Sequence, residues 1–150
     1  MERLSALRPA FRVALTHLGV MNDAVPAAID KVYRALANTL DDKRGRWILS
    51  SHTEAHAEWA LTFHQEQASH YVVDRTFVDE HDIRWIIDYK TAEPVDMTTA
   101  AFLDQQQATY HGQLVGYAEM LQHLDDRPIQ LALYFPLFNG WRAWQYCSEM

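Results

Sequence analysis

The spacing of the apolar residues changes from helical to alternating and back along this chain of 150 residues, and that change constrains its fold most. Before residue 41 apolar side chains recur every three or four residues, which predicts two amphipathic helices. The first is expected from Leu4 to Leu18, stopping at Gly19, and the second from Pro26 to Leu40. Their apolar stripes consist of Leu4, Leu7, Phe11, Leu15 and Leu18, and of Ile29, Val32, Tyr33, Leu36 and Leu40.

From residue 58 onward apolar and polar residues alternate, which predicts β-strands over 58–63, 70–79 and 83–90. The connection Glu80-His81-Asp82 is short enough to join the last two strands as a hairpin. These three strands are therefore expected to be antiparallel neighbours. Three short segments lie between the helices and the strands. Asp41, Asp42 and Gly45 are helix-breaking residues, 47–49 is a short apolar run, and 51–57 is a polar stretch of undetermined state.

The second half of the sequence returns to helical spacing and then to strands. A long helix is expected to end near Leu124, before two strands over Ile129–Pro136 and Trp141–Tyr146. These strands flank Asn139-Gly140, a favoured hairpin turn. The element order ααβββαββ predicts an α/β (α+β) fold with a mixed central sheet and helices packed on it. The buried face of the long helix is expected to contain Tyr110, Leu114, Tyr117, Leu121 and Leu124.

Composition limits the classes of protein to which the chain can belong. No linker-like segment interrupts it, so one domain is the simplest expectation. No apolar run approaches the roughly 20 residues of a membrane helix, and the N-terminus lacks an apolar signal core. A single cysteine, Cys147, excludes an internal disulfide, so we expect a cytoplasmic protein without a membrane partner. The net charge of −7 argues against long-range attraction to nucleic acid.

The residues that point to chemistry are Asp74, Asp88 and Lys90. Asp88 and Lys90 are two apart on one expected strand and so share a face, and the hairpin turn near residue 81 brings Asp74 close to Asp88. Two converging carboxylates repel each other unless a divalent cation such as Mg²⁺ lies between them. A lysine beside such a cation suits phosphodiester hydrolysis, although an Asp-x-Lys sequence also occurs as a solvated ion pair.

Three motifs in order resemble the RecB-like branch of the PD-(D/E)XK nucleases. They are Val72-Val73-Asp74-Arg75, Trp85-Ile86-Ile87-Asp88-Tyr89-Lys90-Thr91 and Tyr110-His111-Gly112-Gln113-Leu114-Val115-Gly116-Tyr117. More narrowly, residues 45–146 are similar to the nuclease domain at the C-terminus of RecB/AddA-type UvrD-like helicase–nucleases. The resemblance implies a restriction-endonuclease-like core over 45–146, preceded by a helical part over 1–44, within one domain.

The resemblance also implies roles for individual residues. Asp74, Asp88 and the backbone carbonyl of Tyr89 would hold Mg²⁺, for which Mn²⁺ is a possible substitute, and Lys90 would position or activate the attacking water. Gln113 and Tyr117 would line the site and help to hold the DNA strand or the lysine, although Tyr117 also fits the packed face of its helix. The implied activity is that of a Mg²⁺-dependent deoxyribonuclease (exonuclease) in double-strand-break repair and recombination, with a helicase motor domain or subunit as partner.

One feature of that branch is missing from the sequence. Its members carry a metal-ligating histidine in a Gly-x-x-x-His context on an early helix, whereas His17 precedes Gly19 here. We therefore expect either a fragment of a longer helicase–nuclease or a trimmed relative. The alternative function is that of a non-catalytic DNA-binding or subunit-docking module. Weaker candidates are the pair His52 and His56 as metal ligands on a helix face, Glu58 near the metal, Trp141 and Trp144 for base stacking, and Cys147 as a nucleophile.

Overall fold

The computed structural model describes residues 2–64 and 68–148. Its elements are α1 (Glu2–Ser5), α2 (Arg8–His17), α3 (Val25–Asp41), α4 (Lys43–Leu49), β1 (Thr53–His64), β2 (Ala68–Val78), β3 (Arg84–Tyr89), α5 (Thr99–Leu121), β4 (Ile129–Phe135) and β5 (Gly140–Gln145). They form two compact units, a helical unit of residues 1–50 with 136–139, and a sheet unit of residues 51–135 with 140–150. The prediction of a mixed sheet with helices is confirmed, but four helices rather than two precede the first strand.

The helical unit contains two helix boundaries that differ from the expectation. The expected helix from Leu4 to Leu18 is broken after Ser5, and α2 begins at Arg8 with proline in its first turn, where a missing N–H costs nothing. Gly45 was expected to break a helix, and that expectation is wrong, because Gly45 lies within α4. The Asp42 side chain accepts a hydrogen bond of 3.0 Å from the N–H of Gly45, so the residue that ends α3 also caps α4.

The apolar stripes of the first helices are buried only in part. Leu4 and Ile29 are buried, whereas Leu18 is 81% exposed and Leu40 is 48% exposed. Since α2 contains no buried residue at all, its predicted stripe does not form a closed core within the described residues. Periodicity therefore identified the helices correctly but overestimated how much of their apolar surface this chain covers.

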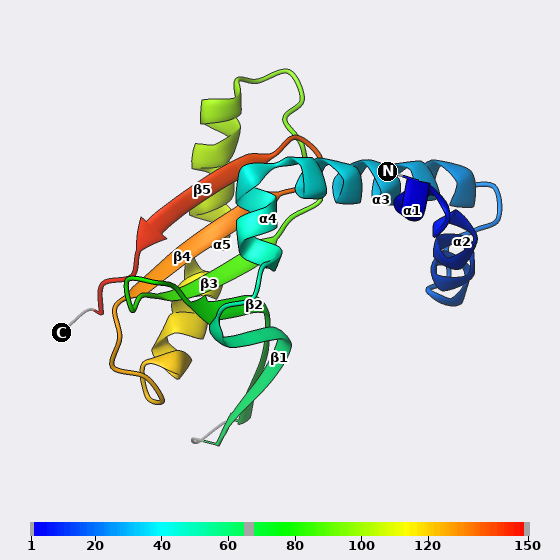
Figure 1. Ribbon diagram of the computed structural model, residues 1–150. Coiled ribbons are helices and arrows are strands. Elements are labelled where there is room, and N and C mark those ends of the chain that lie inside the picture. Colours follow the sequence, from blue (N-terminus) through cyan, green and yellow to red (C-terminus); the bar gives the residue numbers. More distant parts are fainter. Residues whose placement is uncertain (1, 65–67, 149–150) are drawn as a thin grey trace. The chain divides into compact units, whose positions relative to one another are not determined.

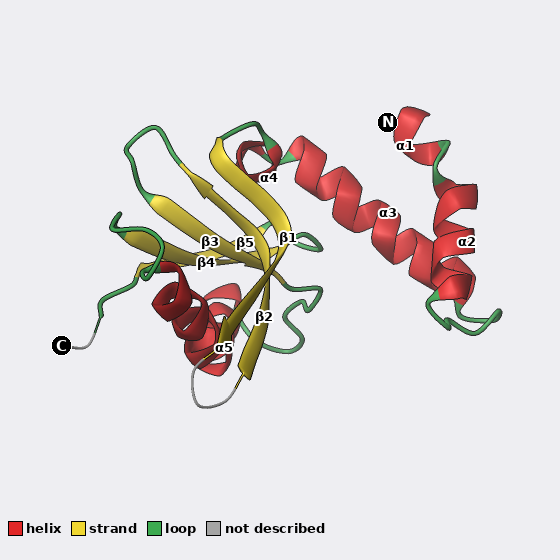
Figure 2. Ribbon diagram, turned by 90° about the horizontal axis from the view of Figure 1, so that it is seen from below, coloured by secondary structure: helices red, strands yellow, loops and turns green. Residues whose placement is uncertain are grey.

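The sheet unit contains one five-stranded sheet in the order β1-β2-β3-β4-β5 (Figures 1 and 2). The pair β3–β4 is parallel and the other pairs are antiparallel. Arg75 pairs with Ile87 across the β2–β3 hairpin, so the register is centred on residue 81 as predicted. Strand β1 starts at Thr53, earlier than expected, because the polar stretch before residue 58 joins the strand through an irregular register.

The connection between β2 and β3 is closed by one aspartate. Asp79 Oδ1 accepts hydrogen bonds of 2.9 and 3.1 Å from the N–H groups of His81 and Ile83. Its other carboxylate oxygen accepts a bond of 2.8 Å from Nε1 of Trp85. Because one side chain binds both the loop and the start of β3, the residues of the loop themselves fix the length of the hairpin connection.

Helix α5 lies along one face of the sheet and contacts β3, β4 and β5 (Figure 1). The hydroxyl of Thr98 accepts a hydrogen bond of 3.2 Å from the N–H of Ala101 and so caps its first turn. Leu114 and Leu121 are buried beneath the helix as predicted. Leu124 is not part of this face, because α5 ends at Leu121 and the Leu124 side chain is 68% exposed.

A buried ionic network surrounds the start of β3. The Arg84 side chain is 4% exposed, and its guanidinium forms ion pairs of 2.6 Å with Glu54 and 2.8 Å with Asp125. Arg127 adds ion pairs of 3.2 Å to Asp125 and 2.7 Å to Asp82. The network therefore ties the starts of β1 and β3 to the loop that follows α5. Among the described helices, none is both long and apolar enough to cross a membrane.

Candidate functional site

Asp74 and Asp88 face each other across the β2–β3 hairpin. The register ends at Arg75 paired with Ile87, and its next step places Asp74 opposite Asp88. One oxygen of Asp74, Oδ2, accepts a hydrogen bond of 2.9 Å from the main-chain N–H of Tyr89. The carboxylate of β2 is thus held against the end of β3, directly beside the residues of the Asp-Tyr-Lys motif.

Asp88 is the most deeply buried acid of this group. The residue is 4% exposed, and its Oδ2 lies 2.6 Å from Nζ of Lys90. This separation is that of a close ion pair between the carboxylate and the ammonium. Burial, together with the charge of the neighbouring Asp74, raises the pKa of Asp88 to about 6 against the opposing effect of Lys90. The site therefore holds more negative charge than one lysine neutralises.

Helix α5 adds a hydrogen-bonded pair to the same site. Nε2 of Gln113 donates a bond of 2.9 Å to the hydroxyl of Tyr117, one helical turn further on. Tyr117 is 5% exposed. Burial raises the pKa of its phenol, and the negative charges of Asp88 and Asp74 raise it further. Tyr117 is therefore a packed residue whose phenol lies in the electrostatic field of the two aspartates.

Two aromatic residues complete the surroundings, and the sequence reasoning had not assigned them a role there. The ring of Tyr110 lies beneath the Lys90 ammonium, with Nζ 3.8 Å from the ring centroid. Tyr71 packs edge-on against Tyr117 with ring centroids 5.7 Å apart. The signal for Tyr110 was its position three residues before Gln113, which places both side chains on one helix face.

The donor set fits a hard divalent cation. Asp74 in the middle of β2 and Asp88 near the end of β3 bring two carboxylates together, and Asp88 is 4% exposed. Mg²⁺ prefers such oxygen ligands and keeps several waters, so it does not need a large protein cage. The described residues include no group of three or more His, Cys, Asp or Glu side chains able to hold a metal. The ligands expected from the sequence are two of these side chains, Asp74 and Asp88, together with a main-chain carbonyl, that of Tyr89.

The weaker candidates lie away from this site or have packing partners. His52 and His56 do not share a helix face, since His56 belongs to β1. Their rings stack on Phe77 and Trp59, with centroid separations of 3.9 and 4.3 Å. Glu58 follows Ala57, which pairs with Arg75, so the register brings Glu58 opposite Asp74. Its backbone φ of 49° and exposed side chain set it apart from the two aspartates.

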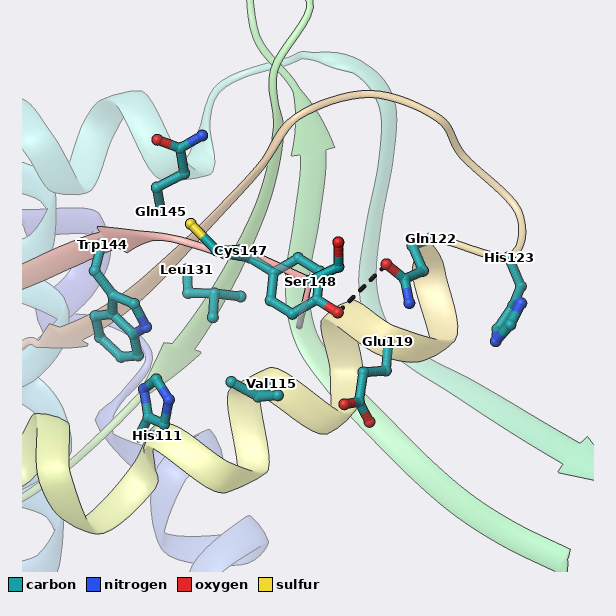
Figure 3. Close-up of a pocket in the computed structure, with 11 residues that line it drawn as sticks. His111, Val115, Glu119, Gln122, His123, Leu131, Trp144, Gln145, Cys147 and Ser148 are labelled. Carbon is teal, nitrogen blue, oxygen red and sulfur yellow. Dashed lines mark hydrogen bonds between the residues drawn. The ribbon is translucent and has the colours of Figure 1, made fainter. Parts of the chain in front are cut away.

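The remaining candidates belong to packed or separate surfaces. The Trp141 ring packs among Trp85 and Tyr134, with centroids 5.8 and 6.4 Å away. The Trp144 ring stacks on His111 at 6.0 Å, and both residues line a cavity of about 620 Å³ (Figure 3). The exposed Cys147 lines the same cavity.

No family model matches the sequence, and no curated protein matches it either. The chemistry of the residues around Asp74 and Asp88 is therefore the basis for proposing a function.

Proposed function

We propose that this chain is a metal-dependent nuclease module that hydrolyses phosphodiester bonds in DNA, of the RecB-like PD-(D/E)XK type. The observation that supports this most is the meeting of Asp74 on β2 with Asp88 and Lys90 at the end of the neighbouring strand β3. A buried acid pair costs free energy, because each carboxylate disfavours ionisation of the other. Such a costly group is typical of a functional site rather than of a structural one.

Each residue has a role that follows from its position. Asp74 and Asp88, with the carbonyl of Tyr89, would bind Mg²⁺ or Mn²⁺. The cation would supply charge neutralisation at the scissile phosphate. Lys90 would orient the attacking water and stabilise negative charge on the phosphoryl group, since its ammonium is held between Asp88 and the Tyr110 ring. Gln113 and Tyr117 would offer an amide and a phenol to the bound strand.

The wider setting of the module is also part of the proposal. Its substrate would be DNA processed during double-strand-break repair and recombination, as the resemblance to helicase–nucleases implies. A helicase motor domain or subunit would deliver the strand. A purely DNA-binding or docking module is the alternative, and it predicts no cleavage and feeble binding of divalent cations.

The deciding experiment is cleavage of end-labelled linear single- and double-stranded DNA by the purified chain in Mg²⁺ or Mn²⁺, compared with the same reactions in EDTA. Asp88→Ala and Lys90→Ala are tested in parallel, with Asp104→Ala as a control. Asp104 is an exposed acid on α5 that pairs with Arg142 and does not touch the carboxylate pair. We expect metal-dependent cleavage that both site variants lose and the control retains.

Two outcomes would contradict the proposal. Cleavage that persists in Asp88→Ala would show that a contaminant or another site is responsible. A parent chain that neither cleaves DNA nor binds Mn²⁺, measured by calorimetry, would favour the non-catalytic alternative. Circular dichroism of each variant shows whether a loss of activity reflects unfolding.

A further inference from the structure

The two units of this chain carry charges of opposite sign. Residues 1–50 contain eight of the 13 Lys and Arg residues but only five of the 20 Asp and Glu residues, a net charge of +3. Residues 51–150 contain the other five cations and 15 acids, a net charge of −10. The net charge of −7 is therefore an average over a basic helical unit and a strongly acidic sheet unit.

The cations of the sheet unit are already engaged. Arg84, Arg127, Arg142 and Lys90 each form an ion pair with an aspartate of the same unit. The remaining cation, Arg75, lies over the Phe77 ring, 5.5 Å from its centroid. An approaching phosphate would have to displace these acids before it could pair with the cations. The sheet unit alone is thus poorly suited to attract a polyanion.

The cations of the helical unit are placed differently. Seven of the eight are exposed, and the eighth, Arg8, forms an ion pair of 2.8 Å with Asp30. Arg44 lies over the Trp47 ring and Arg46 donates to two main-chain carbonyls. Lys31 on α3 and Lys43 on α4 are exposed and form no ion pair with the described residues. Long exposed lysines of this kind bind phosphate groups by charge without needing a shaped pocket.

We infer that the helical unit is the DNA-holding surface of this protein, and that its exposed lysines and arginines supply the phosphate contacts that the acidic sheet unit lacks. The inference extends the proposed nuclease function, because it assigns substrate capture and cleavage to different units. DNA carries a phosphate charge every 1.7 Å or so along its axis, so scattered cations are enough to bind it. Binding of this kind releases counterions and weakens steeply with salt.

The test compares two charge changes of equal size in the full-length chain. Lys31→Gln with Lys43→Gln removes two cations from the helical unit. Gln105→Glu with Gln145→Glu adds two negative charges at exposed positions of the sheet unit and alters the net charge equally. Affinity for a labelled 20-base-pair duplex is measured by fluorescence anisotropy in EDTA over a series of NaCl concentrations. EDTA prevents metal-dependent cleavage, so this readout reports DNA binding alone.

We expect the double lysine variant to lower the salt slope of log affinity by about 1.8, equivalent to two lost phosphate contacts. Its affinity at 0.1 M NaCl should fall at least about tenfold, whereas the glutamate variant should keep the parental slope. Equal effects of both variants would overturn the inference, because net charge alone would then control binding. An unchanged slope in the lysine variant, or no binding by the parent, would also overturn it and favour a protein partner for the helical unit. Cleavage by the lysine variant at saturating DNA separately tests the nuclease proposal.

Discussion

The main-chain N–H of Tyr89 donates a hydrogen bond to the carboxylate of Asp74, which joins the two strands of the hairpin through a side chain at the candidate site. This bond separates the structural role of Asp74 from its proposed chemical role. An asparagine retains an acceptor oxygen for the N–H but lacks the full negative charge that a cation needs. An alanine removes both.

We therefore expect Asp74→Asn and Asp74→Ala to lose cleavage by at least about 100-fold, equivalent to about 2.7 kcal/mol of transition-state stabilisation. Only the alanine variant should lose stability, by about 1–3 kcal/mol, because it leaves the Tyr89 N–H without its acceptor. Urea unfolding and single-turnover cleavage measure the two effects. Parental activity in the asparagine variant would exclude Asp74 as a ligand.

The raised pKa of Asp88 predicts an unusual dependence of stability on pH in metal-free protein. The folded chain holds this proton up to about pH 6, whereas the unfolded chain releases it near the ordinary value of 3.8. Stability from this group is therefore complete below about pH 4 and is lost as the pH rises to about 6, by about 3 kcal/mol. In Asp88→Asn this loss should disappear, so the variant gains stability relative to the parent across that window.

Urea unfolding at several pH values in EDTA tests this expectation, with Asp104→Asn as the matched exposed control. The difference between Asp88→Asn and the parent should grow between pH 4 and 6 and stay constant above pH 7. A difference that does not vary with pH would show that Asp88 ionises normally in the folded protein. Added Mg²⁺ should recover stability in the parent but not in the variant.

Tyr110 is expected to position Lys90 through its ring face. Tyr110→Phe keeps the ring and should cleave DNA within about twofold of the parent, whereas Tyr110→Leu should lower kcat about fivefold with little change in KM. The size follows from an interaction of about 1 kcal/mol between an ammonium and an aromatic ring. Steady-state kinetics at saturating metal provides the measurement, and equal rates for the two variants would contradict a positioning role.

The Arg84 network predicts a contrast between buried and exposed ion pairs. Arg84→Ala removes the closest cation from the buried Asp125. Because a buried charge is then left with weaker compensation, the free energy of unfolding should fall by about 3–5 kcal/mol. Arg142→Ala breaks a more exposed pair with Asp104 and should cost less than about 1 kcal/mol. Replacing both partners, as in Arg84→Met with Asp125→Leu, should recover much of the loss. Equal costs for Arg84→Ala and Arg142→Ala would contradict this account of the network.

The sheet and the hairpin at Asp74 and Asp88 could be predicted from the sequence because their signals are local. Alternation defines the strands, and a three-residue connection leaves one register in which the two aspartates meet. The end of α3 at Asp41 and Asp42 was predicted, but the start of α4 was missed because an N-cap aspartate and a helix-breaking aspartate look alike in sequence. The contact between Tyr110 and Lys90 joins a helix to a distant strand, so it depends on packing that periodicity does not encode.

The length of the loop closed by Asp79 determines which residues of β2 and β3 lie opposite each other at the candidate site. Asp74 and Asp88 stand seven residues on either side of residue 81, so the turn and the strand register together align them. Adding or removing one residue within the loop would turn the Asp-Tyr-Lys segment over, so that Tyr89 rather than Asp88 would share a face with Asp74. The length of this short connection therefore sets which side chains of β3 lie on the same face of the sheet as Asp74.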